Sequence, residues 1–423
     1  MDNYFTDNVY VPEWLLNFRC SGGLCEHTCC QGWNINVDEK HAQMYLQFSD
    51  SCFQPIIHTL MKKTPVLRKH KKSNQEYLFH LPDMPDGKCP LMNQQGLCSL
   101  QIKFGPNALC NTCFFFPRLM WQIDNNYSMS CSLSCPEVLK LAIKPENPGN
   151  FTWMRNPIDP ELDWLETSLI KNISVRTILQ NRQIIVDKCI QFLLDENDPI
   201  PYRIIKISNL FLNMDQINSD NEINKFPQTL LKNFSENKFK NRIPILLPNL
   251  DNKIEQVRLF RSVFDFGLEN GMSSLNEANR TILQIISGSN DPEIILSKNL
   301  LMAEKEIYAP FIQSHPWLEK NLMVFCAFSE ILKQFHTYDD ENGVSLIDVL
   351  NYEAIQMPYI FALFRMIALK NCIISKSITI ESFLQSIFEA DNCYLHYPRY
   401  LKMGIERFPN VFSNPELISL LLL

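Results

Sequence analysis

The second half of the chain carries the spacing of amphipathic helices. Apolar residues recur every three to four positions from Leu162 to Leu169 and again from Ile178 to Phe192, which places them on one helix face. DENDPIP at 195–201 ends that run. Four further stretches show the same spacing: EQVRLFRSVFDFGL (255–268), NEANRTILQIIS (276–287), LEKNLMVFCAFSEILKQF (318–335) and ITIESFLQSIFEA (378–390). The pattern predicts a mainly α-helical domain.

The first 150 residues show no such spacing and consist of short runs bounded by Gly, Pro, Asn and Asp. KPENPGN at 144–150 is rich in turn residues and predicts a linker. We therefore expect a small irregular module over residues 1–145, packed on a larger α-helical domain over residues 146–423. Within the second domain, the Asn- and Lys-rich stretch 213–249 predicts a long loop with one short helix.

Neither a leader peptide nor a membrane span is predicted. MDNYFTDNVY at the start has no basic region followed by an apolar one, which a signal peptide would need. MPYIFALFRMIAL at 357–369 is shorter than the roughly 18 apolar residues of a spanning helix and contains Arg365. We expect a cytoplasmic protein without a membrane partner.

The composition is that of a globular protein, with 46% hydrophobic and 20% charged residues. The net charge of −7 falls wholly on the second part, because residues 1–150 hold 13 basic and 13 acidic residues. Nucleic acid is therefore not an expected partner, since phosphate contacts need Lys and Arg. KKTPVLRKHKK at 62–72 is a solvated loop, a docking patch for an acidic partner or, against the acidic charge of the rest of the chain, a nucleic-acid contact.

Cysteine is the residue type that points most directly to chemistry. The chain has 15 cysteines, and 11 of them lie in the first 135 residues. A reducing cytosol does not sustain disulfides, so clustered thiols there indicate ligands for a soft metal or an iron–sulfur cluster. Later in the chain, Cys189 and Cys326 sit in apolar helical patterns, where a free cysteine packs as a small hydrophobe.

Two dense segments carry the thiols, CSGGLCEHTCCQGW at 20–33 and the region from Cys89 to Cys135. The pairs Cys25/Cys29 and Cys110/Cys113 have a spacing typical of zinc knuckles. A [4Fe–4S] cluster also takes four thiolates, often with one before proline, as in Cys135-Pro136. An iron–sulfur cluster is the favoured interpretation, zinc is the alternative, and a purely structural role is the third.

The order of these residues resembles the flagellin lysine-N-methylase family (FliB), and more loosely a group of zinc- or iron-chelating CxxCxxCC proteins. The resemblance covers residues 10–140. It is carried by Cys20, Cys25-Glu26, Thr28-Cys29-Cys30, Gly32-Trp33, Asp38, Lys88-Cys89-Pro90, Gly96-Leu97-Cys98, Thr112-Cys113, Pro117-Arg118 and Ser134-Cys135-Pro136-Glu137. It implies that the metal ligands come from eight cysteines: Cys20, Cys25, Cys29, Cys30, Cys89, Cys98, Cys113 and Cys135. Cys52, Cys110 and Cys131 fall outside this pattern.

The resemblance also implies S-adenosylmethionine-dependent methylation of surface lysines of flagellin. The sequence singles out neither a catalytic base nor a donor site, and it lacks a glycine-rich G-x-G-x-x-G turn. The C-x3-C-x2-C spacing of radical enzymes is also absent, so we expect a structural, cofactor-binding or redox-sensing metal centre. A metal storage or delivery protein and an iron–sulfur redox sensor are the rival functions.

Overall fold

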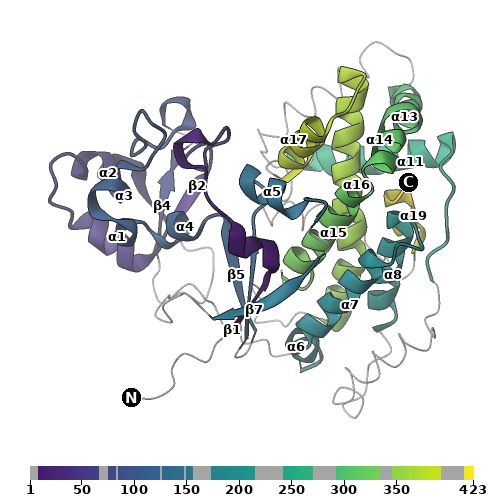
Figure 1. Cartoon of the computed structure of the whole chain (residues 1–423), viewed down its shortest axis with the longest axis horizontal. Coiled ribbons are helices and arrows are strands. Elements are labelled where there is room, and N and C mark those ends of the chain that lie inside the picture. The colour runs from purple at the N-terminus through teal and green to yellow at the C-terminus, as the bar shows by residue number, and fades with distance from the viewer. Residues whose placement is uncertain are drawn as a thin grey trace. The chain divides into compact units, whose positions relative to one another are not determined.

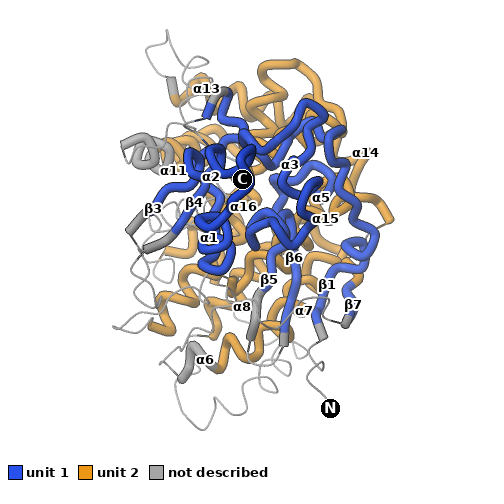
Figure 2. The backbone as a smooth tube through the Cα atoms, turned by 90° about the vertical axis from the view of Figure 1, so that its left-hand side faces the viewer, with its two compact units in different colours: residues 1–138, 151–168 blue, residues 139–150, 169–423 orange. Residues whose placement is uncertain are grey.

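A computed structural model gives the fold of the chain. It describes residues 8–65, 75–81, 84–123, 126–146, 149–155, 173–214, 242–269, 292–333, 345–391 and 414–423. The chain forms two compact units, which Figure 2 shows in blue and orange. Unit 1 comprises Met1–Val138 and Phe151–Ser168, and unit 2 comprises Leu139–Asn150 and Leu169–Leu423.

Unit 2 is helical (Figure 1). Its centre is α16 (Leu346–Ser375), which is buried on nearly every side and packs against α8, α13, α17 and α19. Ser345 begins this helix by accepting a hydrogen bond from the backbone N–H of Asp348. The other helices are α6 (Ile173–Gln180), α7 (Arg182–Leu194), α8 (Ile200–Leu212), α11 (Leu250–Glu269), α13 (Pro292–Ala303), α14 (Ala309–Ser314), α15 (Trp317–Glu330), α17 (Ile380–Ala390) and α19 (Glu416–Leu421). A π-helical turn, Glu304–Tyr308, joins α13 to α14.

The predicted mainly α-helical fold is confirmed. Helices α7, α11, α15 and α17 occupy four of the stretches in which the apolar spacing predicts them. Cys189 and Cys326 are fully buried among apolar side chains, as their positions in helical patterns predict.

Helix α16 is long and apolar enough to cross a membrane by composition alone. However, 78% of its most apolar window is buried inside unit 2, which is the environment of a core helix. The sequence pattern marked 357–369 as apolar, a stretch that includes Arg365 and lies between Gln356 and Lys370. In the structure the helix is 30 residues long, and Arg365 is accommodated by polar partners inside the unit.

Unit 1 contains a four-stranded sheet in the order β5-β6-β1-β7. The strands are β1 (Asn8–Pro12), β5 (Arg118–Ile123), β6 (Asn126–Cys131) and β7 (Phe151–Arg155). β1 pairs parallel with β6 and antiparallel with β7, while β5 and β6 form an antiparallel pair. Val9 and Val11 of β1 are fully buried, so this sheet contributes side chains to the apolar core.

A second, antiparallel sheet in unit 1 has the order β2-β4-β3, with β2 at Asn34–Val37, β3 at Met61–Pro65 and β4 at Gln75–His80. Its inner face packs on short helices: α1 (Glu39–Leu46), α2 (Gln54–Leu60), α3 (Ser99–Phe104) and α4 (Asn111–Phe115). Ile35 pairs with Phe79 in register, and both are buried. The prediction that the first module is irregular is wrong, because its strands form two sheets. The strands have only four to six residues, too few for an alternating pattern to be recognised in the sequence.

The chain crosses between the units around the predicted linker. α5 (Pro136–Ala142) begins in unit 1 and ends in unit 2, and Phe151–Ser168 returns to unit 1. The boundary at residues 145 and 146 therefore stays a prediction. Several expectations lie outside the described residues: the helix at 276–287, most of the loop at 213–249, Leu162 to Leu169, and residues 66–72 of the basic stretch.

Candidate functional site

The first thiol loop, residues 20–29, is held by a close contact with the turn at 95–97 and by a hydrogen bond from Trp33. Cys20, Cys25 and Cys29 come from residues 20–29, and Cys20 and Cys29 are exposed. Gly23 allows the loop to pack against the turn at 95–97, since a Cβ there would lie 1.9 Å from the Gln95 carbonyl oxygen. At the other end, Trp33 Nε1 donates to the Cys29 carbonyl at 2.7 Å. We call Cys20, Cys25, Cys29 and Cys135 the loop thiols.

A second group of thiols lies in or against the apolar core of the β2-β4-β3 sheet, with Cys89 and Cys110 buried and the other three partly buried. Its members all belong to one hydrophobic cluster, and we call them the core thiols: Cys30, Cys89, Cys98, Cys110 and Cys113. Backbone pairing brings them together, because the Cys89 N–H donates to the Cys30 carbonyl at 2.8 Å. Met92 and Cys98 form a bridge that closes the turn between Cys89 and Cys98.

Asp38 organises the surroundings of Cys110. Its carboxylate accepts from the backbone N–H and from Nδ1 of His41, at 3.1 and 2.7 Å, and caps α1. The same carboxylate accepts from the Asn111 N–H at 2.8 Å, in the first turn of α4. Burial opposes ionisation, but these hydrogen bonds lower the pKa of Asp38 overall, and the contact with Asp38 raises the pKa of His41. Asp38 therefore ties α1 to the helix that carries Cys113.

The pKa shifts of the thiols follow the same two groups, because most thiols are affected by members of their own group. Cys113 donates a hydrogen bond to Cys110, which lowers the pKa of Cys110 and raises that of Cys113. Burial raises the pKa of Cys89 to about 12, and Cys30, Cys98 and Cys110 add to it. For the loop thiols, burial raises the pKa of Cys135, with Cys25 and Cys20 contributing. Cys29 and Cys30 connect the groups, because a hydrogen bond from Cys29 lowers the pKa of Cys30 to about 7.

The structure thus brings the eight predicted cysteines into two neighbourhoods within unit 1. In the described part of the chain, no three His, Cys, Asp or Glu side chains are already arranged as a metal site. The ligand set stays a prediction. Of the cysteines outside the family pattern, Cys52 is exposed, Cys131 is buried at the end of β6, and Cys110 lies among the core thiols. The Cys110-x2-Cys113 spacing was the sequence signal for this last placement.

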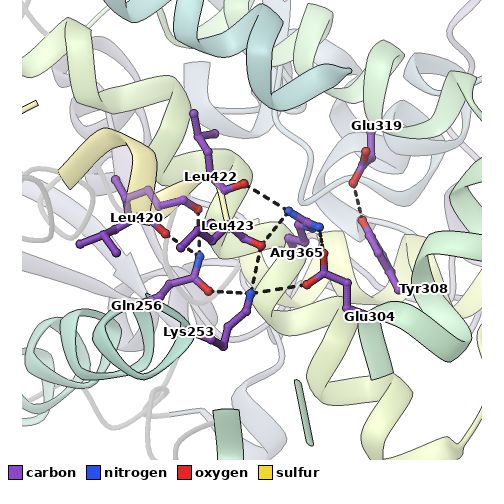
Figure 3. A network of polar contacts seen from close by, with 10 residues as sticks. Lys253, Gln256, Glu304, Tyr308, Glu319, Arg365, Leu420, Leu422 and Leu423 are labelled. Carbon is purple, nitrogen blue, oxygen red and sulfur yellow. Dashed lines mark hydrogen bonds and ion pairs between the residues drawn. The ribbon is translucent and has the colours of Figure 1, made fainter. Parts of the chain in front are cut away.

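Unit 2 holds a buried polar network that the sequence patterns did not indicate (Figure 3). Lys253 of α11 is 1% exposed, and its ammonium group donates to Gln256, Glu304 and the Leu423 oxygen at 2.9, 3.4 and 3.0 Å. Arg365 of α16 contacts Glu304 and donates to the Leu422 and Leu423 oxygens at 3.4 and 3.2 Å. Glu304 therefore stands between two cations.

The π-helical turn supplies both Glu304 and Tyr308, whose side chains lie toward Arg365 in Figure 3. Tyr308 donates to Glu319 of α15 at 2.8 Å, and the Arg365 guanidinium lies 6.0 Å from the Tyr308 ring centre. Burial lowers the pKa of Lys253 to about 8 and raises the pKa of Glu319. Arg365 inside an apolar run was the one signal of this network in the sequence; its other members are ordinary surface-type residues in separate segments.

Comparison with known proteins gives consistent matches. The profile of the FliB lysine N-methylase C-terminal domain matches residues 186–403, which is 218 of the 423 residues. A stretch of 130 residues is 35% identical to the flagellar biosynthetic protein FliU of Salmonella muenchen, covering 31% of this chain and 73% of that protein.

Two proteins named lysine-N-methylase show the same degree of similarity. They come from Salmonella choleraesuis (strain SC-B67) and Salmonella typhimurium (strain LT2), each 35% identical over 130 residues. The aligned stretch covers 31% of this chain and 31% of each relative, so it spans about a third of their length. No solved structure matches the chain.

Proposed function

Because the chain belongs to the FliB lysine N-methylase family, we propose that it is an S-adenosylmethionine-dependent methyltransferase acting on surface lysines of flagellin. The observation that carries this proposal is the family match over 186–403, supported by two relatives named lysine-N-methylase and one named as a flagellar biosynthetic protein. Modification would take place in the cytoplasm, before flagellin is exported.

Methyl transfer to lysine requires the neutral amine. With a pKa near 10.4, only about one free lysine in ~2,500 is neutral at pH 7. The enzyme must therefore desolvate the substrate lysine or take up its proton, and align the nitrogen with the sulfonium methyl group. Desolvation of a lysine occurs in the interior of unit 2, since burial lowers the pKa of Lys253 to about 8. We assign Lys253 itself to the scaffold, because its ammonium group is enclosed by protein oxygens.

The family pattern also implies a metal centre, and the thiols of unit 1 fit one chemically. Soft thiolates suit a [4Fe–4S] cluster or, as the alternative, zinc, and the predicted ligands lie in two groups that the fold gathers from distant segments. When bound, such a group would cross-link the segments of unit 1 and provide a cofactor-binding surface. The substitution at nitrogen is polar, so the transfer does not call for radical chemistry.

The test is an assay of anaerobically purified full-length protein with flagellin and S-adenosylmethionine carrying a deuterated methyl group. The proposal predicts deuterated mono- or dimethyl-lysine in flagellin peptides identified by mass spectrometry. A flagellin variant with its modified lysines replaced by arginine should receive no label. Unlabelled flagellin, together with ready loss of bound metal to chelators, would contradict the proposal and favour a metal storage or delivery protein.

A further inference from the structure

The corner between α14 and α15 in unit 2 holds His315 in a fixed position. The His315 N–H donates to the Ile312 carbonyl at 3.0 Å, and the His315 carbonyl accepts from the Leu318 N–H at 3.1 Å. Pro316 follows directly, and its ring restricts the backbone where α15 begins. Main-chain hydrogen bonds on both sides therefore set where the imidazole ring lies.

The hydrogen bonds of the imidazole ring determine which nitrogen carries the proton. Nδ1 of His315 lies 2.9 Å from the Phe311 carbonyl oxygen and 2.9 Å from Oγ of Ser314. A carbonyl oxygen can only accept, so Nδ1 is the donor and the neutral ring has its lone pair on Nε2. Nε2 has no hydrogen-bond partner among the described residues. The ring is thus held by one nitrogen and free to accept a proton at the other, as a general base requires.

Capping of α14 does not by itself explain a histidine at this corner. Ser314 Oγ also donates to the Phe311 carbonyl, at 2.8 Å, so this carbonyl has a partner without His315. Within the part of the chain that the structure describes, no ion pair joins His315 to a carboxylate. A role that uses Nε2 accounts for the imidazole where capping does not.

Aromatic side chains flank the His315 ring. The ring centres of Phe311 and His315 are 4.6 Å apart, and Trp317 meets His315 edge to face at 5.3 Å. Phe383 of α17 is buried and contacts Phe311, with ring centres 6.0 Å apart. Phe311, His315 and Trp317 are only partly buried, so they are accessible. Aromatic faces attract an ammonium group and pack against the methylene stem of a lysine.

We infer that His315 Nε2 is the base that takes the proton from the substrate lysine, and that Phe311 and Trp317 bind the side chain of this lysine. The inference rests on the proposed function and deepens it by naming the lysine site. The proton moves from the ammonium group to Nε2, which leaves a neutral amine and an imidazolium. The amine lone pair then forms the N–C bond to the methyl group, while the S–C bond breaks and its electron pair stays on sulfur. A thioether and a methylated ammonium result, and the imidazolium releases its proton to water.

The test measures rates of full-length variants, purified without oxygen, with flagellin and S-adenosylmethionine carrying a deuterated methyl group. H315N keeps an amide N–H near the position of Nδ1, which preserves the bond to Phe311, but has no base in place of Nε2. We expect kcat to fall by about 10²–10⁴-fold, with KM for flagellin changed much less. H58N is the matched control, because His58 is exposed on α2 of unit 1, and it should keep the wild-type rate. W317L should instead mainly raise KM for flagellin.

Free imidazole separates a base from a packing role, since it should restore part of the rate lost in H315G. Circular dichroism and thermal unfolding show whether each variant keeps the fold. A wild-type rate for H315N, or a slow, folded H315G that imidazole does not accelerate, would overturn the inference and leave the proposed function standing. Absence of labelling by the wild type would overturn the proposed function and the inference with it.

Discussion

The core thiols of unit 1 and the polar network of unit 2 differ in the groups that surround their polar atoms. In unit 2, Lys253 and Arg365 are matched by Glu304 and by main-chain oxygens at the end of the described chain. In unit 1, the core thiols belong to a hydrophobic cluster, and burial raises the pKa of Cys89. The two cations of unit 2 are thus matched by oxygens of the protein, apart from Arg365 Nε, which has no hydrogen-bond partner in the described residues, whereas the core thiols lie among apolar side chains.

The largest change in the free energy of unfolding is expected from Arg365→Met. The substitution leaves the Glu304 carboxylate beside Lys253 alone and removes the donors to the Leu422 and Leu423 oxygens. Breaking one side of a buried ion pair costs about 3–5 kcal/mol, and urea unfolding of the full chain measures it. Arg258→Met is the control, because Arg258 is exposed and solvent screens its pairs with Glu255 and Glu293, so its loss should change stability far less. Equal losses for the two variants would show that the network is not a buried unit.

Lys253 should make stability depend on pH in the alkaline range. Its pKa is about 8 in the folded protein and 10.5 in the unfolded chain. Between these values the unfolded chain binds a proton that the folded chain does not, so the free energy of unfolding rises with pH, by roughly 3 kcal/mol in all. Below pH 8 both states are protonated and the cost of burying the charge is fully present.

Lys253→Met isolates this effect from the other alkaline titrations. The variant leaves Glu304 paired with Arg365, so its stability at pH 7 should fall by no more than ~1 kcal/mol or should increase. Urea unfolding of both proteins from pH 7 to pH 10 gives the comparison. Parallel pH profiles for the variant and the wild type would mean that Lys253 is not the group responsible.

A smaller effect is expected in the thiol loop from Gly23→Ala. The added Cβ would lie 1.9 Å from the Gln95 carbonyl oxygen, so the loop must shift, at a cost of about 1–3 kcal/mol. Leu24→Ala is the neighbouring control, since Leu24 is 89% exposed and its removal should change stability by less than ~0.5 kcal/mol. Thermal unfolding measures both, and an unaffected G23A would contradict the close packing of this loop.

The sequence revealed the helices whose apolar residues fall on one face, such as α15 and α17. It did not reveal the full length of α16, because that helix is buried on nearly every side and shows no polar face from which a period can be read. The strands of unit 1 could not be predicted either, because a run of four to six residues is too short to show an alternating pattern. Sequence spacing identified the thiols as a group, but pairing between Cys30 and Cys89 depends on backbone contacts that only the fold provides.

Apart from Arg365, the members of the polar network could not be identified from the sequence. Lys253, Glu304 and Arg365 are separated by about 50 to 60 residues each, and nothing local to any one of them specifies the others. Arg365 was conspicuous in an apolar run, yet its partners are Glu304 of the π-helical turn and the oxygens of Leu422 and Leu423. Buried pairs of this kind are set by packing between elements, which composition and periodicity do not encode.

We propose that the chain methylates flagellin lysines, that the thiols of unit 1 hold a metal centre needed for this reaction, and that the polar network of unit 2 stabilises the fold. One measurement tests it directly: transfer of a deuterated methyl group from S-adenosylmethionine to flagellin by wild type, K253M and C113S, each purified without oxygen. We expect equal labelling by wild type and K253M and a large loss for C113S. No labelling by the wild type, or full labelling by C113S depleted of metal, would contradict it.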